Sequence, residues 1–177
     1  MALPEPHADA LRRVSRELTT AGVRHGVGGS GLLALLGLPV TVRDLDVEID
    51  PGSATAVATL PVLQGFSVTV PYATRGAMVT TARGALGGGT MVSGTLGGVR
   101  VEVFEHPGLH IDGRWRALPL RSSGTAALDG DEIPLADTGF WWALYSLLNP
   151  DKAALLAPLV PRAERRRACA ELGLPDR

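Results

Sequence analysis

Residues 44–50, DLDVEID, alternate acidic and apolar side chains from the first position to the last. In an extended chain successive side chains point to opposite faces, so an alternation with a period of two is typical of a β-strand. One face of this strand carries Leu45, Val47 and Ile49. The other face carries only acids, which makes the run the most informative segment of the chain.

Two of these acids, Asp44 and Asp46, leave the same face of the strand from Cα atoms about 6.6 Å apart. Two carboxylates about 4 Å apart repel each other by roughly 4 kcal/mol at an effective dielectric constant of 20. The pair therefore needs a cation or full hydration. Mg²⁺ is the predicted cation, because it binds carboxylate oxygens and bridges them to substrate phosphates. A solvated strand face is the alternative, whereas the apolar residues between the acids argue against an EF-hand loop.

The tripeptide Gly28-Gly29-Ser30 lies between a predicted strand and a predicted helix. Glycines leave backbone N–H groups unobstructed, and Ser30 adds a hydroxyl at a helix N-terminus, where phosphate groups bind readily. The alternative is a tight turn in which Ser30 is an ordinary N-cap. Only one short helix separates Ser30 from Asp44, so the turn and the acidic strand are predicted to lie side by side.

The rest of the chain divides into helices and short strands. Apolar periodicity predicts helices at residues 8–21, 31–36, 53–63 (capped by Ser53), 138–148 (capped by Asp137 or Thr138), and one or two within 151–172, interrupted at Pro158 and Pro161. Strands are predicted at residues 23–27, 66–70, 77–82, 90–96, 99–104, 115–118 and 132–135, with the four from 66 to 104 as an antiparallel meander. This order predicts an α+β fold: a small mixed sheet flanked by helices, residues 1–136, and a C-terminal helical segment packed on it, residues 137–177.

Charge and composition exclude several kinds of partner. A net charge of −1 and a pI near 6.4 create no general field for nucleic acid, so no nucleic-acid partner is predicted. The longest uncharged apolar stretch, residues 26–42, is interrupted by glycines and a proline and is too short to span a membrane. The single cysteine, Cys169, and a start without a basic and an apolar region predict a cytoplasmic protein.

The two motifs together resemble a known signature. Val27-Gly28-Gly29-Ser30, a short helix and then Arg43-Asp44-Leu45-Asp46-Val47 look like the signature of the nucleotidyltransferase superfamily typified by DNA polymerase beta. Within it the chain is similar to small bacterial aminoglycoside and lincosamide nucleotidyltransferases and to minimal nucleotidyltransferases of toxin and antitoxin systems. The resemblance implies a nucleotidyltransferase-like fold and transfer of a nucleoside monophosphate from an NTP to a hydroxyl. The acceptor would be a small molecule such as an antibiotic, or a protein or RNA.

The same resemblance gives individual residues a role. Asp44, Asp46 and Glu102 would be the catalytic residues and hold two Mg²⁺ ions, and Glu102 is also a candidate base for the acceptor hydroxyl. Family members more often carry Asp at this third position, and an exposed strand face around Glu102 is the alternative. The predicted nucleotide-binding residues are Gly28, Gly29, Ser30, Arg43 and Lys152.

Several of these side chains also have a purely structural explanation. Arg43 balances the acidic face of the strand, and Lys152 fits the exposed start of a late helix. The spacing of Trp141, Trp142 and Tyr145 predicts core packing rather than base stacking.

Two other functions remain open. The fold without catalysis, as a nucleotide-binding or regulatory module, is favoured by the Glu at position 102 and by the few basic residues for a triphosphate. A sugar transferase that uses Asp44 and Asp46 as its metal motif ranks last, since such domains usually place a larger α/β unit before the motif.

Overall fold

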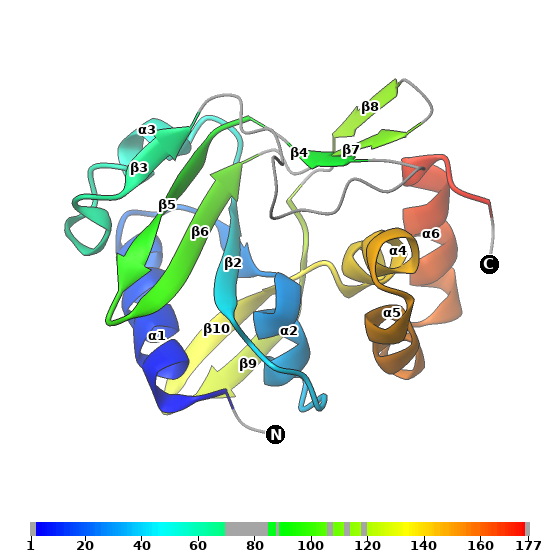
Figure 1. Ribbon diagram of the computed structural model, residues 1–177, viewed down its shortest axis with the longest axis horizontal. Helices are drawn as coiled ribbons and strands as arrows, with labels where there is room; N and C mark the ends of the chain where they lie inside the picture. The colour runs from blue at the N-terminus through cyan, green and yellow to red at the C-terminus, as the bar shows by residue number, and fades with distance from the viewer. Residues whose placement is uncertain are drawn as a thin grey trace.

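The computed structural model describes residues 3–69, 85–87, 89–105, 108–111, 114–117 and 120–175 (Figure 1). Its helices are α1 (Glu5–Thr20), α2 (Gly29–Leu35), α3 (Ala54–Val57), α4 (Thr138–Leu148), α5 (Pro150–Leu156) and α6 (Arg162–Leu172), with 3₁₀ turns η1 (Pro61–Leu63) and η2 (Ala157–Leu159). Its strands are β1 (His25–Val27), β2 (Asp44–Ile49), β3 (Ser67–Thr69), β4 (Ala85–Gly87), β5 (Met91–Leu96), β6 (Val99–Glu105), β7 (Gly108–Ile111), β8 (Arg114–Ala117), β9 (Ser122–Leu128) and β10 (Asp131–Ala136).

Seven strands form one mixed sheet in the order β3-β5-β6-β2-β1-β10-β9, and β4, β7 and β8 form a smaller one. β2 pairs in parallel with β6, and β1 with β10, whereas the other neighbours in the large sheet are antiparallel. The predicted α+β architecture, a mixed sheet flanked by helices with helices at the C-terminal end, is confirmed. The meander is confirmed for β3, β5 and β6, and the strand expected at residues 77–82 lies outside the described residues.

Two tight hairpins set the register of neighbouring strands. Gly97 and Gly98 join β5 to β6 with φ of 58° and 82°, and Asp129 and Gly130 join β9 to β10 with φ of 49° and 90°. A two-residue hairpin with positive φ at both positions matches the twist of the strands, and Gly and Asp tolerate that conformation best. Sequence patterning missed the strands β4, β7 and β9. β9 gave no signal because it is mostly exposed and has no alternating pattern.

Helix α1 covers the apolar face of β2. One buried cluster contains Leu11, Val14, Leu45, Val47 and Ile49, each no more than 1% exposed. Burial of such a side chain contributes roughly 1.5–3 kcal/mol, so this face holds β2 firmly in the sheet. The predicted division of the strand into an apolar and an acidic face is confirmed.

The C-terminal helices share a second core with the opposite side of the sheet. Leu32 and Leu33 of α2 and Leu135 of β10 belong to one buried cluster with residues of α4, α5 and α6. Figure 1 shows these three helices grouped at one side of the sheet. The division of the chain at residue 136 stays a prediction. Over the described ranges, no helix is long and apolar enough to cross a membrane.

The prediction of one continuous helix at residues 53–63 is wrong. α3 ends at Val57 and a separate turn, η1, begins at Pro61. Leu60 has an extended conformation (φ −64°, ψ 138°), because the ring of a following proline disfavours the helical region. Ser53 is the N-cap residue of α3, as predicted, but its side chain makes no capping hydrogen bond to a described residue.

The helix predicted at residues 31–36 begins two residues earlier, at Gly29. Its N-cap is Gly28, so Ser30 lies within the first turn and is not the cap. The fourth helix begins as predicted, with Asp137 as its N-cap, and the last part of the chain forms α5, η2 and α6. Pro161 immediately precedes α6, as expected for a residue that cannot continue a helix.

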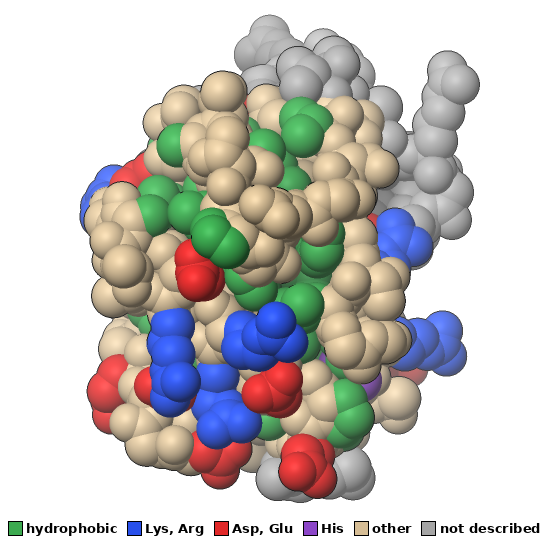
Figure 2. All heavy atoms as spheres, turned by 90° about the vertical axis from the view of Figure 1, so that its left-hand side faces the viewer, with side chains coloured by type: hydrophobic (Ala, Val, Ile, Leu, Met, Phe, Trp, Pro, Cys, Tyr) green, Lys and Arg blue, Asp and Glu red, His purple; other side chains and the backbone are tan. Residues whose placement is uncertain are grey.

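The surface over α1 carries both signs of charge, as Figure 2 shows for the face that lies on the left in Figure 1. Arg13 lies 3.8 Å from Asp9, and Arg16 lies 2.8 Å from Asp131. Because basic and acidic groups are interspersed, the described part of this face has no continuous basic patch of the kind that binds a phosphate backbone.

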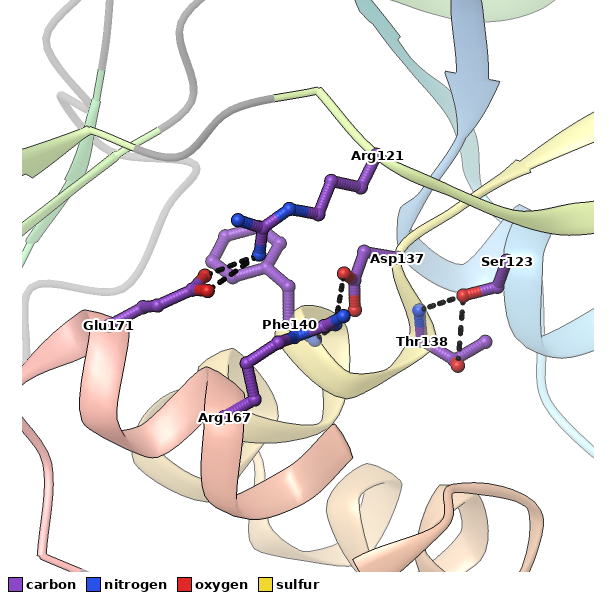
Figure 3. Close-up of polar contacts among 7 residues, drawn as sticks. All are labelled: Arg121, Ser123, Asp137, Thr138, Phe140, Arg167 and Glu171. Atoms are coloured by element: carbon purple, nitrogen blue, oxygen red, sulfur yellow. Dashed lines mark hydrogen bonds and ion pairs between the residues drawn. The ribbon is translucent and has the colours of Figure 1, made fainter. Parts of the chain in front are cut away.

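Asp137 ties the C-terminal helices to one another (Figure 3). Its Oδ1 accepts a hydrogen bond from the backbone N–H of Phe140 at 2.9 Å, and its Oδ2 accepts one from Arg167 of α6. Alongside it, the hydroxyl of Ser123 on β9 accepts a hydrogen bond from the backbone N–H of Thr138 at 2.9 Å. The start of α4 is therefore fixed both to the sheet and to α6.

We expect Asp137→Ala to lower the free energy of unfolding by about 1–3 kcal/mol, because the helix loses its cap and Arg167 loses its partly buried acceptor. Asp137→Asn keeps an oxygen that accepts the hydrogen bond from the Phe140 N–H, so its free energy of unfolding should fall clearly less than that of Asp137→Ala. Urea unfolding of both variants measures the difference, and equal stabilities of Asp137→Ala and the wild-type protein would contradict it.

Candidate functional site

The acidic face of β2 lies beside a second acid on β6. The parallel register pairs Asp46 with Glu102 and Asp44 with Arg100. Adjacent strands are about 4.8 Å apart, and laterally paired side chains project from the same face. The pairing thus brings Asp44, Asp46 and Glu102 to one region of the sheet, which the sequence alone could not establish.

The turn at residues 28–30 lies directly against Asp46. The backbone N–H of Gly28 donates to the carbonyl oxygen of Asp46 at 2.9 Å. Gly29 has φ of +57°, and a Cβ at this position would lie 1.8 Å from Oδ2 of Asp46. Only glycine fits here, both for its conformation and for the space. The two sequence motifs therefore lie side by side, as predicted.

Crowding of negative charge perturbs Asp46. Burial, followed by the charges of Asp44 and Glu102, raises the pKa of the Asp46 carboxyl to about 7, and the positive charges of Lys152 and Arg100 oppose this rise. A carboxylate that is costly to ionise beside other acids is one that a bound cation would stabilise. Asp44 and Asp46 thus have the oxygen chemistry and the electrostatic need that fit Mg²⁺.

Glu102 is engaged by a neighbour on its own strand. Its Oε1 accepts a hydrogen bond from Nε of Arg100 at 2.8 Å and forms an ion pair with Nη2 of the same residue at 2.5 Å. In the part of the chain that the structure describes, no group of three or more His, Cys, Asp and Glu side chains is arranged to hold a metal ion. The assignment of Glu102 as a third metal ligand stays a prediction.

Lys152 reaches the site from the start of α5. Its ammonium group lies 5.1 Å from the ring centroid of Tyr145, and the charges of Asp46 and Asp44 act on it. Burial lowers the pKa of Lys152, while the two acids favour its charged form. Arg43 is exposed, and its positive charge disfavours the charged form of Lys152. Both predicted basic residues therefore lie near the acids.

Trp141 is a site residue that sequence analysis assigned only to the core. Its Nε1–H donates to Oε1 of Glu48 at 2.6 Å, and Glu48 is buried at 3% exposure. Burial raises the pKa of Glu48 to about 8, although this hydrogen bond opposes the shift. A Cβ on Gly28 would lie 2.3 Å from Cζ2 of Trp141, so the first glycine of the turn makes room for this ring.

Trp141, Trp142 and Tyr145 are 5–6% exposed, so the predicted core packing is confirmed. Yet Trp141 and Tyr145, whose ring centroids are 5.5 Å apart, also cover the acidic face of β2. Glu48 was the available signal in the sequence, because a third acid on a half-buried strand needs a hydrogen-bond donor from the element that covers it.

A cavity of about 680 Å³ lies between the sheet and the C-terminal helices, beside the contacts of Asp137. Leu36, Leu135, Ser123, Thr138 and Arg167 are among the residues that line it. Its described lining includes none of the predicted catalytic or nucleotide-binding residues. The predicted site and this cavity are therefore separate features of the fold.

Solved structures of other proteins resemble the chain, among them the following three. The Thermotoga maritima protein TM1012, described as a candidate nucleotidyltransferase, is 22% identical with a TM-score of 0.65, over 90% of this chain and 94% of that one. The solution structure of the antibiotic-resistance factor ANT(2″)-Ia is 10% identical with a TM-score of 0.57, over 95% and 91% of the two chains. The crystal structure of ANT(2″)-Ia in complex with adenylyl-2″-tobramycin is 10% identical with a TM-score of 0.56, over 94% and 97%.

The sequence itself matches no protein-family model and no curated protein. Because the structural likeness extends over nine-tenths or more of this chain, it shows that the chain has a nucleotidyltransferase-like fold. The fold that the sequence motifs implied is confirmed.

We expect Gly29→Ala to destabilise the protein by at least about 1 kcal/mol more than Gly37→Ala. Both residues have positive φ, of 57° and 80°, but a Cβ on Gly37 meets no described atom within 4 Å, whereas on Gly29 it meets Asp46. The comparison separates backbone strain from the collision with the carboxylate. Urea unfolding of the two variants checks it, and equal losses would show that the contact with Asp46 is unimportant.

We expect Asp46 to make the protein less stable as the pH rises from about 4 to about 7. In this range the folded carboxyl, with its pKa of about 7, retains a proton that the unfolded chain has released, so the free energy of unfolding falls with pH. Asp46→Asn cannot ionise, so its stability relative to the wild-type protein should increase between pH 5 and pH 8. Unfolding in the presence of a chelator measures this, and parallel pH profiles of the two proteins would refute it.

Proposed function

We propose that this protein is a Mg²⁺-dependent nucleotidyltransferase that moves a nucleoside monophosphate from an NTP to a hydroxyl of an acceptor in the cytoplasm. The observation that carries the proposal is the contact of Gly29, in the first turn of α2, with Asp46 in a cluster of acids. A turn with free N–H groups can bind phosphate, and neighbouring carboxylates can bind the cation that accompanies it.

In this proposal Asp44 and Asp46 hold Mg²⁺, and Glu102 joins them. When bound, Mg²⁺ neutralises the charge of the triphosphate and stabilises the charge that develops as pyrophosphate leaves. The contacts of Arg100 are with Oε1 of Glu102, which leaves Oε2 as the oxygen that can reach the cation. Arg100, whose side chain is 55% exposed, can also move away and free both oxygens.

Some of the predicted nucleotide-binding residues would contact the nucleotide directly, and others would act through a neighbouring residue. Gly29 and Ser30 present N–H groups of the first helical turn, which have no acceptor within the helix. Gly28 acts indirectly, because its own N–H already donates to Asp46 and its missing side chain admits Trp141. Lys152 and Arg43 supply positive charge for the phosphates.

The reaction forms a bond between the acceptor hydroxyl oxygen and the α-phosphorus of the NTP. The bond from that phosphorus to the oxygen of pyrophosphate breaks, and pyrophosphate leaves with the electron pair. The hydroxyl proton passes to a carboxylate, for which Glu102 is the candidate. The complex of ANT(2″)-Ia with adenylyl-2″-tobramycin supports a small-molecule acceptor, while a protein or RNA acceptor is the other possibility.

One observation favours a second function, a nucleotide-binding module without catalysis. Glu102 is hydrogen-bonded to Arg100 and the acids are not gathered into a metal site among the described side chains. A protein of this kind would bind Mg-NTP and release no pyrophosphate with any acceptor.

We expect isothermal titration with ATP, GTP, CTP and UTP to detect binding of at least one nucleotide in the presence of Mg²⁺ and much weaker binding in its absence. Asp46→Asn should weaken this binding at least about tenfold, which corresponds to about 1.4 kcal/mol. Asp50→Asn is the matched control, because Asp50 ends the same acidic run but pairs with Arg24 at 2.6 Å, away from the site. Asp50→Asn should bind like the wild-type protein.

Failure of all four nucleotides to bind would reject both proposed functions. If Mg-NTP binds, an assay of pyrophosphate release with a panel of hydroxyl-bearing antibiotics distinguishes them. Release that depends on both acceptor and Asp46 supports the transferase.

A further inference from the structure

The hydroxyl of Tyr145 has an unusual environment for a buried polar group. The residue lies on α4 and is 6% exposed, and its Oη has no hydrogen-bond partner among the described residues. A buried hydroxyl without a partner loses its hydrogen bonds to water and gains none in return, so such groups are rare in folded proteins. The missing partner therefore calls for an explanation.

The surroundings of Tyr145 show where a partner would have to come from. The negative charges of Asp46 and Asp44 act on this hydroxyl, which places it in the region of the predicted site. The ring is packed against Trp141, with centroids 5.5 Å apart, and Trp141 is itself held by Glu48. The ring is thus fixed from one side and cannot easily turn away to find another acceptor.

The remaining neighbour of the ring is Lys152, whose ammonium group lies 5.1 Å from the ring centroid. The hydroxyl and the ammonium group are both hydrogen-bond donors, and an anionic oxygen is an acceptor that can satisfy both. Lys152 has a long, flexible side chain, so it can move toward such an anion.

We propose that the Tyr145 hydroxyl donates a hydrogen bond to a phosphate oxygen of the bound nucleotide, next to the ammonium group of Lys152. The inference rests on the proposed function, since it assumes that the nucleotide binds at Asp44 and Asp46. It adds a binding residue that sequence spacing assigned to the core. It also explains why α4 carries a buried hydroxyl group that lowers the stability of the protein without ligand.

The test compares Tyr145→Phe with the wild-type protein in two measurements. Titration with Mg-NTP, and separately with Mg²⁺ and inorganic tripolyphosphate, should show about tenfold weaker binding of both ligands to the variant, because a hydrogen bond to an anion is lost. The melting temperature without ligand should stay the same or rise, because the variant no longer buries an unpaired hydroxyl. Weaker binding by a protein of equal or greater stability is a combination that a merely structural role would not produce.

Ser146→Ala is the matched control on the same helix. The Ser146 hydroxyl donates to the carbonyl oxygen of Trp142 at 2.9 Å and is therefore satisfied within the fold. Its removal should leave the affinity for both ligands unchanged.

The outcomes separate this inference from the proposed function. If the wild-type protein binds no Mg-NTP, the proposed function fails and the inference with it. If the wild-type protein binds and Tyr145→Phe binds equally well, only the inference is overturned. Weaker binding of NTP with unchanged binding of tripolyphosphate would place the hydroxyl at the nucleoside and overturn the phosphate contact. A fall in melting temperature would show that the hydroxyl has a partner within the fold, and would also overturn it.

Discussion

The hydrogen bond from Trp141 to Glu48 joins the C-terminal helices to the large sheet, and the arrangement of the site depends on it. β2 presents acids on the face that α4 covers, and burial of an acid without a donor would be costly. Trp141 supplies the donor at 2.6 Å, and its ring fills the space that Gly28 leaves open. One aromatic residue thus connects the acidic strand, the glycine turn and the C-terminal helices.

The same arrangement leaves electrostatic strain at the site. Asp44, Asp46 and Glu102 lie on one face of two parallel strands, and their mutual repulsion adds to burial in raising the pKa of Asp46. Lys152 and Arg100 offset only part of this repulsion. A fold held together by its apolar face can tolerate the strain, because α1 and the core strands bury large side chains on the other side of β2. A cation with its phosphate ligand is the chemical group that would relieve it.

The aromatic residues over the acids are held rigidly, whereas the basic side chains near them are long and flexible. Asp137, Arg167 and Ser123 fix the start of α4, so Trp141 and Tyr145 are held in place over the acids. Lys152 and Arg43, the groups proposed to meet the phosphates, are long side chains that can move while the sheet keeps its arrangement.

The sequence by itself determined β2, its two faces, the glycine turn beside it and the α+β outline, because alternation and glycine spacing act locally along the chain. It misjudged the helix at residues 53–63, where the conformation imposed by Pro61 outweighed an apolar pattern. Only the tertiary structure decided that Glu102 lies beside Asp46, that Arg100 engages it, and that Trp141 and Tyr145 cover the acids. Apart from the pair of Arg100 and Glu102, which are two positions apart on one strand, these contacts join residues 56 to 99 positions apart. The register of parallel strands and the packing of helices on a sheet leave no local signal in the sequence.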